Sequence, residues 1–311
     1  PELPLAPLKE PDEIAFANTA LESFAALVTF VLLFACIAKI KMQRGIKHVT
    51  SKEAKRNTLD YILIIWLVIH MIVLTADVLS WTAMDFGKNE VWLLFMLNLT
   101  FTCLSLECMV YTYYVKETIY QHEMIGNTYV YLVMLSTVIA IILWITSDIS
   151  GKFYYLDTQG NYTQGSMYWL CQFYCIIVMC GNIVILLKHR KALVRHDVLS
   201  LLMYGLIPIA SIPAQMLWKS TTFNLATTLA LIYICISVHM AQYDRIVEQE
   251  KLLIQQEHEL SMNQMQMMIA QIQPHFLYNS LTALAQLCSK DPKEAKKAII
   301  NFADYWRNHI N

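Results

Sequence analysis

A histidine that directly follows a proline is the feature of this sequence best suited to chemistry. Pro274 removes one backbone N–H and crowds the carbonyl group of Ala270, so a kink or loosening is expected in a helix that contains it. The kink would bring His275 to solvent and to a phosphoryl donor. A neutral imidazole can attack the γ-phosphate of ATP near physiological pH. The sequence therefore offers a candidate phosphoacceptor, which would hold the phosphoryl group through a labile P–N bond.

An asparagine lies one helical turn beyond this histidine. Asn279 is four residues after His275 and would share its helix face. Phe276 follows the histidine directly, so no adjacent carboxylate is available as a base. The Asn279 amide could orient water or a phosphoryl oxygen, which predicts a part in phosphatase activity. The alternative interpretation is that His275 is an ordinary surface residue, as a lone histidine on a helix normally is.

The sequence around the histidine favours the chemical interpretation. Residues 271–280 read QIQPHFLYNS and resemble the phosphoacceptor signature of the LytS-like bacterial sensor histidine kinases. Residues 302–308, FADYWRN, are similar to the second helix of that family's dimerisation domain, with a looser match around Trp306. The resemblance implies autophosphorylation of His275 with ATP and Mg²⁺, and transfer to an aspartate of a response regulator, expected to be a transcription factor. Direct contact with nucleic acid is not expected.

The same resemblance predicts an ATP-binding domain after Asn311. Residues 1–311 contain no P-loop and no glycine-rich stretch, and only eight glycines occur. The sequence also begins at Pro1 without a methionine. We therefore expect this chain to bind neither ATP nor a metal ion itself, and to be the sensor and phosphoacceptor part of a longer kinase.

Long apolar segments fill the sequence before this tail. The chain is 57% hydrophobic and 15% charged, whereas soluble domains carry about 25% charged residues. A helix needs roughly 20 apolar residues to cross a bilayer. The fold class is therefore predicted to be all-α and integral to the membrane, with residues 1–240 forming a seven-helix sensor bundle. The predicted spans are 17–40, 59–81, 91–115, 129–146, 167–187, 198–218 and 223–240.

Basic residues set the predicted orientation, because cytoplasmic connections are enriched in Lys and Arg. Most of the Lys and Arg of the membrane half lie in the connections 41–58, 116–128 and 188–197. The tail before the first span and the other connections hold only Lys9, Lys88, Lys152 and Lys219. The N-terminus is thus expected outside and the C-terminus inside, in a multi-pass protein of the bacterial cytoplasmic membrane.

Ionisable side chains inside the spans are candidates for a ligand site, because charge within a membrane is costly. His70 and Asp77 are seven residues apart and would share one helix face. Glu22 and Gln215 lie near the outer ends of their spans, and Asp77 lies in an outer half. These four residues could bind an extracellular or membrane-borne ligand, or could form hydrogen bonds between helices. A structural role is favoured for two other ionisable groups, Glu107 and His239.

The connection 148–166 has the pattern of a β-hairpin. An aromatic run precedes Gln159-Gly160-Asn161, and Tyr162-Thr163 follows. The hairpin would either close a ligand pocket or cover the helix ends. Seven spans, this long connection and a kinase tail are together similar to the seven-helix sensor region of certain Gram-positive histidine kinases.

A long helix is expected to leave the last span, because residues 241–273 contain neither Gly nor Pro. Apolar residues recur there every seven positions, which indicates a coiled-coil signalling linker over 241–270. The seam residues are Ile246, Leu253, Leu260 and Met267. The complementary seam positions are mostly polar, so two packings could lie close in free energy. The seam would join two copies into a homodimer, either as a switch or as a plain stalk.

The end of the chain has the pattern of a helical hairpin. Asp291 can cap the start of a helix, Pro292 suits the first helical position and Glu294 suits the first turn. Residues 271–311 are therefore predicted to form a dimerisation and phosphotransfer hairpin. Two copies would make a four-helix bundle.

Other functional classes fit the sequence less well. The last predicted span has no lysine for a retinal Schiff base, and no repeat of broken helices indicates a transporter. None of the eight cysteines lies in a C-x-x-C motif, so disulfides and a zinc site are not expected. The leading alternative is a non-enzymatic receptor or scaffold whose tail only dimerises. An uptake protein with a regulatory tail comes next.

Overall fold

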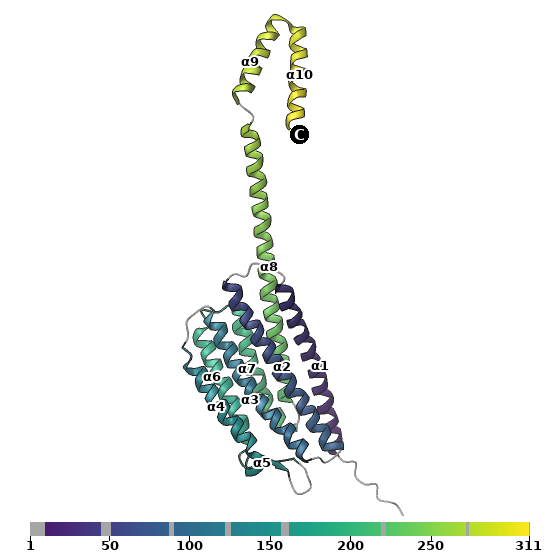
Figure 1. Ribbon diagram of the computed structural model, residues 1–311, viewed down its shortest axis with the longest axis vertical. Helices are drawn as coiled ribbons and strands as arrows, with labels where there is room; N and C mark the ends of the chain where they lie inside the picture. Colours follow the sequence, from purple (N-terminus) through teal and green to yellow (C-terminus); the bar gives the residue numbers. More distant parts are fainter. Residues whose placement is uncertain are drawn as a thin grey trace, which may run out of the picture. The chain divides into compact units, whose positions relative to one another are not determined.

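The computed structural model describes most of the chain and divides it into two compact units. The units are Pro1–Ala241 and Gln242–Asn311. Almost all described residues are helical (Figure 1). The described residues are 10–44, 51–86, 90–121, 126–156, 162–218, 222–271 and 274–310.

Seven of the described helices are long and apolar enough to cross a membrane. They are α1 (Glu10–Arg44), α2 (Ser51–Phe86), α3 (Glu90–Tyr120), α4 (Thr128–Ile145), α6 (Trp169–His189), α7 (Arg195–Trp218) and α8 (Thr222–Gln271). The predicted all-α membrane class is confirmed. Several helices overrun their apolar spans, because polar turns such as 51–58 continue a helix beyond its apolar part. The protein is therefore a multi-pass membrane protein by the length and composition of its helices.

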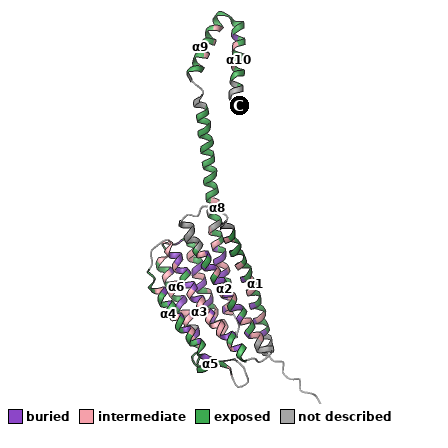
Figure 2. Cartoon of the chain, in the orientation of Figure 1, coloured by how far each residue is buried: buried purple, intermediate pink, exposed green. Residues whose placement is uncertain are grey.

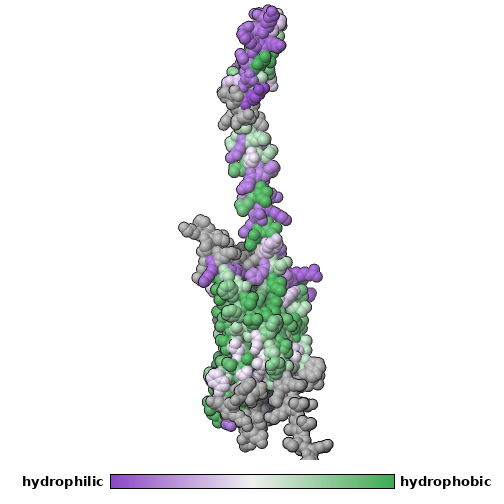
Figure 3. Space-filling view, turned by 90° about the vertical axis from the view of Figure 1, so that its right-hand side faces the viewer, coloured by the Kyte–Doolittle hydropathy of each residue, from purple (hydrophilic) through white to green (hydrophobic). Residues whose placement is uncertain are grey.

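The outer face of the bundle is apolar where a bilayer would surround it. Phe24, Phe30 and Phe34 of α1 are 64%, 55% and 67% exposed. Hydrophobic side chains cover much of the bundle surface in Figure 3, while buried residues lie between the helices in Figure 2. Helices that are apolar on both their inner and outer faces suit a lipid environment.

Aromatic side chains join α2, α3 and α7 in the middle of the bundle. Trp66, Tyr111 and Tyr204 are buried. The ring centroids of Trp66 and Tyr204 lie 4.5 Å apart in an edge-to-face contact, and those of Tyr111 and Tyr204 lie 4.7 Å apart. The Tyr111 hydroxyl donates a hydrogen bond of 2.8 Å to the carbonyl oxygen of Leu201. These directional contacts fix the three helices against one another.

A small hairpin lies between α4 and α6. The short helix α5 (Ser147–Ser150) precedes the antiparallel strands β1 (Tyr154–Leu156) and β2 (Tyr162–Gln164). The predicted β-hairpin is confirmed, although its turn residues Gln159-Gly160-Asn161 lie outside the described residues. The orientation of the spans stays a prediction, and some of its basic residues also lie outside them: Lys9, Lys47, Lys88 and Lys219.

The first strand packs onto the ends of α3 and α4. The buried ring of Tyr154 stacks on Phe101, with centroids 5.0 Å apart. The Tyr154 hydroxyl is shared between Oδ1 of Asn98 and the carbonyl oxygen of Trp144. Ser147 accepts the Tyr154 backbone N–H at 2.9 Å and donates to its carbonyl oxygen at 2.8 Å. These contacts favour the interpretation that the hairpin covers the helix ends.

The second unit contains the rest of α8 and a helical hairpin. Its helices α9 (Pro274–Lys290) and α10 (Pro292–Ile310) pack on each other. α8 ends at Gln271, and Pro274 is the first residue of α9. The kink or loosening expected at Pro274 stays a prediction. At that position the missing N–H has no helical partner to lose. Residues 272–273 lie outside the described residues.

The predicted cap of α10 is confirmed. Oδ1 of Asp291 accepts hydrogen bonds from the backbone N–H groups of Lys293 at 3.0 Å and Glu294 at 3.2 Å. These are two of the donors that the start of a helix leaves without a backbone partner. Asp291 is the one residue between α9 and α10, and its side chain caps the start of α10.

Candidate functional site

His275 is the second residue of α9 and its side chain is exposed. Nδ2 of Asn279 lies 3.2 Å from Nδ1 and 3.4 Å from Nε2 of the imidazole ring. The amide of Asn279 is therefore within hydrogen-bonding distance of the imidazole ring. A neutral ring is the nucleophilic form. The predicted proximity of the two side chains is confirmed.

Packing between α9 and α10 holds the turn that carries the histidine. The rings of Phe276 and Tyr305 lie 6.4 Å apart, centroid to centroid. Farther along the hairpin, Leu284 and Leu287 of α9 are half-buried and Ala295 of α10 is buried. The imidazole is therefore both accessible to solvent and carried by a packed helix, which are the two conditions for reaction with an external phosphoryl donor.

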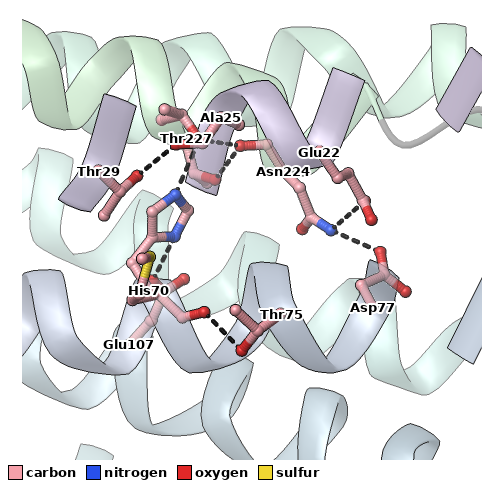
Figure 4. A network of polar contacts seen from close by, with 11 residues as sticks. Glu22, Ala25, Thr29, His70, Thr75, Asp77, Glu107, Asn224 and Thr227 are labelled. Atoms are coloured by element: carbon pink, nitrogen blue, oxygen red, sulfur yellow. Dashed lines mark hydrogen bonds and ion pairs between the residues drawn. The ribbon is translucent and has the colours of Figure 1, made fainter. Parts of the chain in front are cut away.

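A second polar site lies inside the membrane bundle (Figure 4). Nδ2 of Asn224, in the first turn of α8, donates to Oε1 of Glu22 on α1 at 3.0 Å. The same nitrogen donates to Oδ2 of Asp77 on α2 at 2.8 Å. An amide nitrogen has two N–H donors, so these two carboxyl groups use both. One side chain of α8 thus connects two other helices.

The next turn of α8 contacts a buried pair formed by a histidine and a glutamate of two other helices. Nδ1 of His70 on α2 lies 2.7 Å from Oε1 of Glu107 on α3, and the two side chains are 0% and 2% exposed. Nε2 of His70 lies 2.8 Å from the hydroxyl of Thr228. That hydroxyl donates its one proton to the carbonyl oxygen of Asn224 at 2.8 Å. It therefore accepts a proton from Nε2 of His70.

The proton count of this pair follows from its hydrogen bonds. With Nε2 donating to Thr228, the short contact between Nδ1 of His70 and Oε1 of Glu107 needs one further proton. The proton belongs either to an imidazolium beside a carboxylate or to a carboxylic acid beside a neutral ring. Both arrangements have no net charge, which avoids the cost of an uncompensated charge in the interior.

Three of the four predicted ligand residues belong to this connected network. Glu22 and Asp77 share the amide of Asn224, and His70 is joined to the same turn of α8 through Thr228. The predicted common face of His70 and Asp77 is thereby confirmed, because both contact α8. Gln215, on α7, takes no part in these contacts, and its buried Oε1 has no hydrogen-bond partner.

Asn224 and Thr228 were not among the residues predicted for this site. The candidates were ionisable side chains and Gln215, whereas Asn224 and Thr228 are polar and uncharged. Their spacing of four residues within an apolar span was the available signal, since it places both on one helix face. The structural role favoured for Glu107 is confirmed by its contact with His70. His239 is exposed on α8, so burial does not support the role expected for it.

Buried contacts of similar chemistry join other helices of the bundle. Nδ2 of Asn182 on α6 donates to the hydroxyl of Thr112 on α3 at 2.9 Å, and Asn182 is fully buried. Lys39 of α1 and Asp60 of α2 form an ion pair of 2.6 Å. Asn182 is therefore a natural counterpart to Asn224, because it is the same residue type in the same bundle but joins α6 to α3.

The described cysteines are free thiols, and two pairs of them are in contact. The thiol of Cys36 on α1 lies close to that of Cys235 on α8. The thiol of Cys108 on α3 lies close to that of Cys175 on α6. Among the described residues, no group of three or more His, Cys, Asp or Glu side chains could hold a metal ion.

Comparison with known proteins locates a family resemblance in the second unit. Residues 263–311 match the family model of histidine kinases. The matched segment begins within α8 and contains α9 and α10, so it includes His275 and Asn279. No curated protein matches the chain.

Proposed function

We propose that His275 is the phosphoacceptor of a two-component system. The histidine-kinase match and the seven candidate spans fit a LytS-like sensor histidine kinase. In this proposal the bundle lies in the bacterial cytoplasmic membrane and senses an extracellular or membrane-borne ligand. Sensing controls phosphorylation of His275 and transfer to an aspartate of a response regulator. The observation that carries the proposal is an exposed histidine, in contact with Asn279, inside the segment that matches histidine kinases.

The chemistry needs little from this chain beyond a presented imidazole. A ring nitrogen with a lone pair forms the P–N bond while the P–O bond to ADP breaks, and the ring proton passes to solvent. The response-regulator carboxylate then forms a P–O bond as the P–N bond breaks. ATP and Mg²⁺ would be held by the ATP-binding domain that the family resemblance predicts. Asn279 would orient the ring before transfer, or a water that removes the phosphoryl group.

A second copy of the chain is the partner that the second unit supports best. The seam residues Ile246, Leu253 and Leu260 are 61%, 60% and 58% exposed. On the hairpin, Phe276, Leu281 and Ile299 are 47%, 49% and 46% exposed. Apolar side chains at a seven-residue spacing are expected to be covered by another helix in a coiled coil. A homodimer would cover the seam and complete a four-helix bundle.

The test is autophosphorylation of the complete protein in membranes with ATP labelled at the γ-phosphate. We expect acid-labile label in the wild type and none in His275→Gln. The matched control is His258→Gln, which removes another exposed histidine from α8 and should leave the label unchanged. Equal label in all three proteins would place the reaction elsewhere. Absence of label from all three would instead favour a receptor that only dimerises.

The role of Asn279 is tested by its loss. Asn279→Ala removes the amide that contacts the ring. We expect label to form on His275 but dephosphorylation of the response regulator to slow by about 100-fold, the lower end of the range typical of a positioned acid–base group. An unchanged dephosphorylation rate would remove Asn279 from the mechanism.

A further inference from the structure

One turn of α8 is connected to three other helices of the bundle. The amide of Asn224 reaches Glu22 on α1 and Asp77 on α2. Thr228, one turn further along, contacts His70, which in turn contacts Glu107 on α3. Figure 4 shows these side chains converging from their separate helices.

The connection is continuous in hydrogen bonds through Asn224. Its carbonyl oxygen accepts the hydroxyl protons of Thr227 and Thr228, each at 2.8 Å. Because the Thr228 hydroxyl donates to this carbonyl oxygen, it accepts the hydrogen bond from His70. Both N–H groups of the Asn224 side-chain amide donate to the two carboxyl groups. Sliding or rotating α8 would therefore break its bonds to α1 and α2 together, and would remove the partner of the histidine that contacts α3. Such a group of bonds has two discrete arrangements, made or broken, and few intermediate ones.

The same helix enters the segment with kinase chemistry. α8 runs from Thr222 to Gln271, and the histidine-kinase match begins at residue 263. We propose that Asn224 is the positioning residue through which the bundle controls phosphorylation of His275, and that breaking its hydrogen bonds to Glu22 and Asp77 is the switching event. This inference rests on the proposed kinase function and adds the residue that transmits the signal.

The first test compares two asparagines that join helices, the half-buried Asn224 and the buried Asn182, in the complete protein in membranes. Asn224→Ala detaches α8 from the carboxyl groups, whereas Asn182→Ala detaches α6 from α3. Both lose hydrogen bonds between helices, so both are expected to be less stable. We expect the rate of His275 labelling to change about fivefold or more in Asn224→Ala, the lower end of typical allosteric coupling. It should change less than twofold in Asn182→Ala.

The two cysteine pairs give a readout that is independent of catalysis. Cys36 and Cys235 join α1 to α8, and Cys108 and Cys175 join α3 to α6. Copper phenanthroline and oxygen take up the two electrons and two protons released when a thiol pair forms a disulfide. We expect Asn224→Ala to change the trapping rate of the first pair only. Asn182→Ala should change that of the second pair only.

Exchanging the amide and the carboxyl group between positions 224 and 77 distinguishes loss of the α2–α8 hydrogen bond from general destabilisation of the bundle. Asn224→Asp places a third carboxyl group beside Glu22 and Asp77 and removes both donors, so its labelling rate should differ from the wild type at least as much as that of Asn224→Ala. Adding Asp77→Asn returns an amide donor and a carboxylate acceptor to the α2–α8 contact. We expect the double variant to move back towards the wild-type rate.

The outcomes distinguish this inference from the function on which it rests. Absence of label on His275 in the wild type would overturn the proposed kinase function. Label on His275 with equal responses from Asn224→Ala and Asn182→Ala would overturn only the role of Asn224. The same conclusion would follow if Asn224→Ala changed neither the labelling rate nor the trapping of Cys36 with Cys235.

Discussion

The two units differ in how far one chain can bury its own apolar surface. In the bundle Trp66, Leu67 and Leu74 have no exposed surface, and the buried side chains of His70 and Glu107 are paired between helices. In the second unit Ala295 is the one fully buried hydrophobic residue among those described, while large apolar side chains such as Leu253 are about as exposed as those that face lipid. The bundle therefore has an interior of its own, whereas the second unit needs another surface to cover it.

The two units also place their reactive groups differently. His70 and Glu107 are buried in a neutral pair, where hydrogen bonds to neighbouring helices hold them. His275 is exposed, with Asn279 as its contact. A histidine fixed between helices can hold an arrangement, while one at the surface can meet a phosphoryl donor. The same residue type thus suits a structural part in one unit and a chemical part in the other.

The largest effect should come from breaking the buried pair of the bundle. Glu107→Leu leaves His70 buried without its partner and should lower the free energy of unfolding by about 3 kcal/mol. Adding His70→Leu removes the second polar group and should restore most of that loss, because paired apolar replacements are often nearly neutral. Unfolding in detergent, followed by tryptophan fluorescence, measures both. A single variant as stable as the wild type would show that the pair does not hold the bundle.

A smaller effect is expected when the uncovered seam of the second unit is charged. Leu253→Glu would place like charges together in a dimer and should weaken association by about 2 kcal/mol, or roughly 30-fold in dissociation constant. Gln255→Glu adds the same charge away from the seam and is the control. Energy transfer between labelled copies in lipid nanodiscs measures association. Equal weakening by both substitutions would argue against the seam, and the melting of the bundle should stay unchanged in each.

The smallest effect concerns the cap between α9 and α10. Asp291→Ala removes the acceptor of two backbone N–H groups and should cost about 1 kcal/mol, whereas Asp291→Asn should keep most of the cap. Hydrogen exchange should become about fivefold faster in the first turns of α10 and stay unchanged in the bundle. Exchange that is unaffected in α10 would mean that packing against α9 alone starts this helix.

Features that depend on local pattern could be predicted from the sequence. Hydropathy gave the seven spans, and the order Asp291-Pro292 gave the start of α10. The phosphoacceptor segment was predicted by its resemblance to a family signature, and the match over 263–311 includes it. The sequence placed the change from linker to hairpin near Pro274, but it did not show whether the proline would lie in a helix interior or in a first turn, because proline suits both.

Features that depend on the packing of distant helices could not be predicted. Asn224 is 202 residues from Glu22 and 147 residues from Asp77 in the sequence. The 3.6-residue period of an α-helix shows which residues share a helix face. It does not show which other helix that face contacts. The ionisable residues of the network could be proposed individually, whereas the uncharged residue that joins them required the structure.

The central claim is tested most directly by locating the phosphoryl group on the complete protein. The protein is labelled with ATP in membranes, digested at a pH that preserves P–N bonds, and its peptides are sequenced by mass spectrometry. The account predicts a phosphoryl group on His275, in the peptide that contains Asn279. A phosphoryl group on His258, or on any residue of the bundle in place of His275, would contradict it.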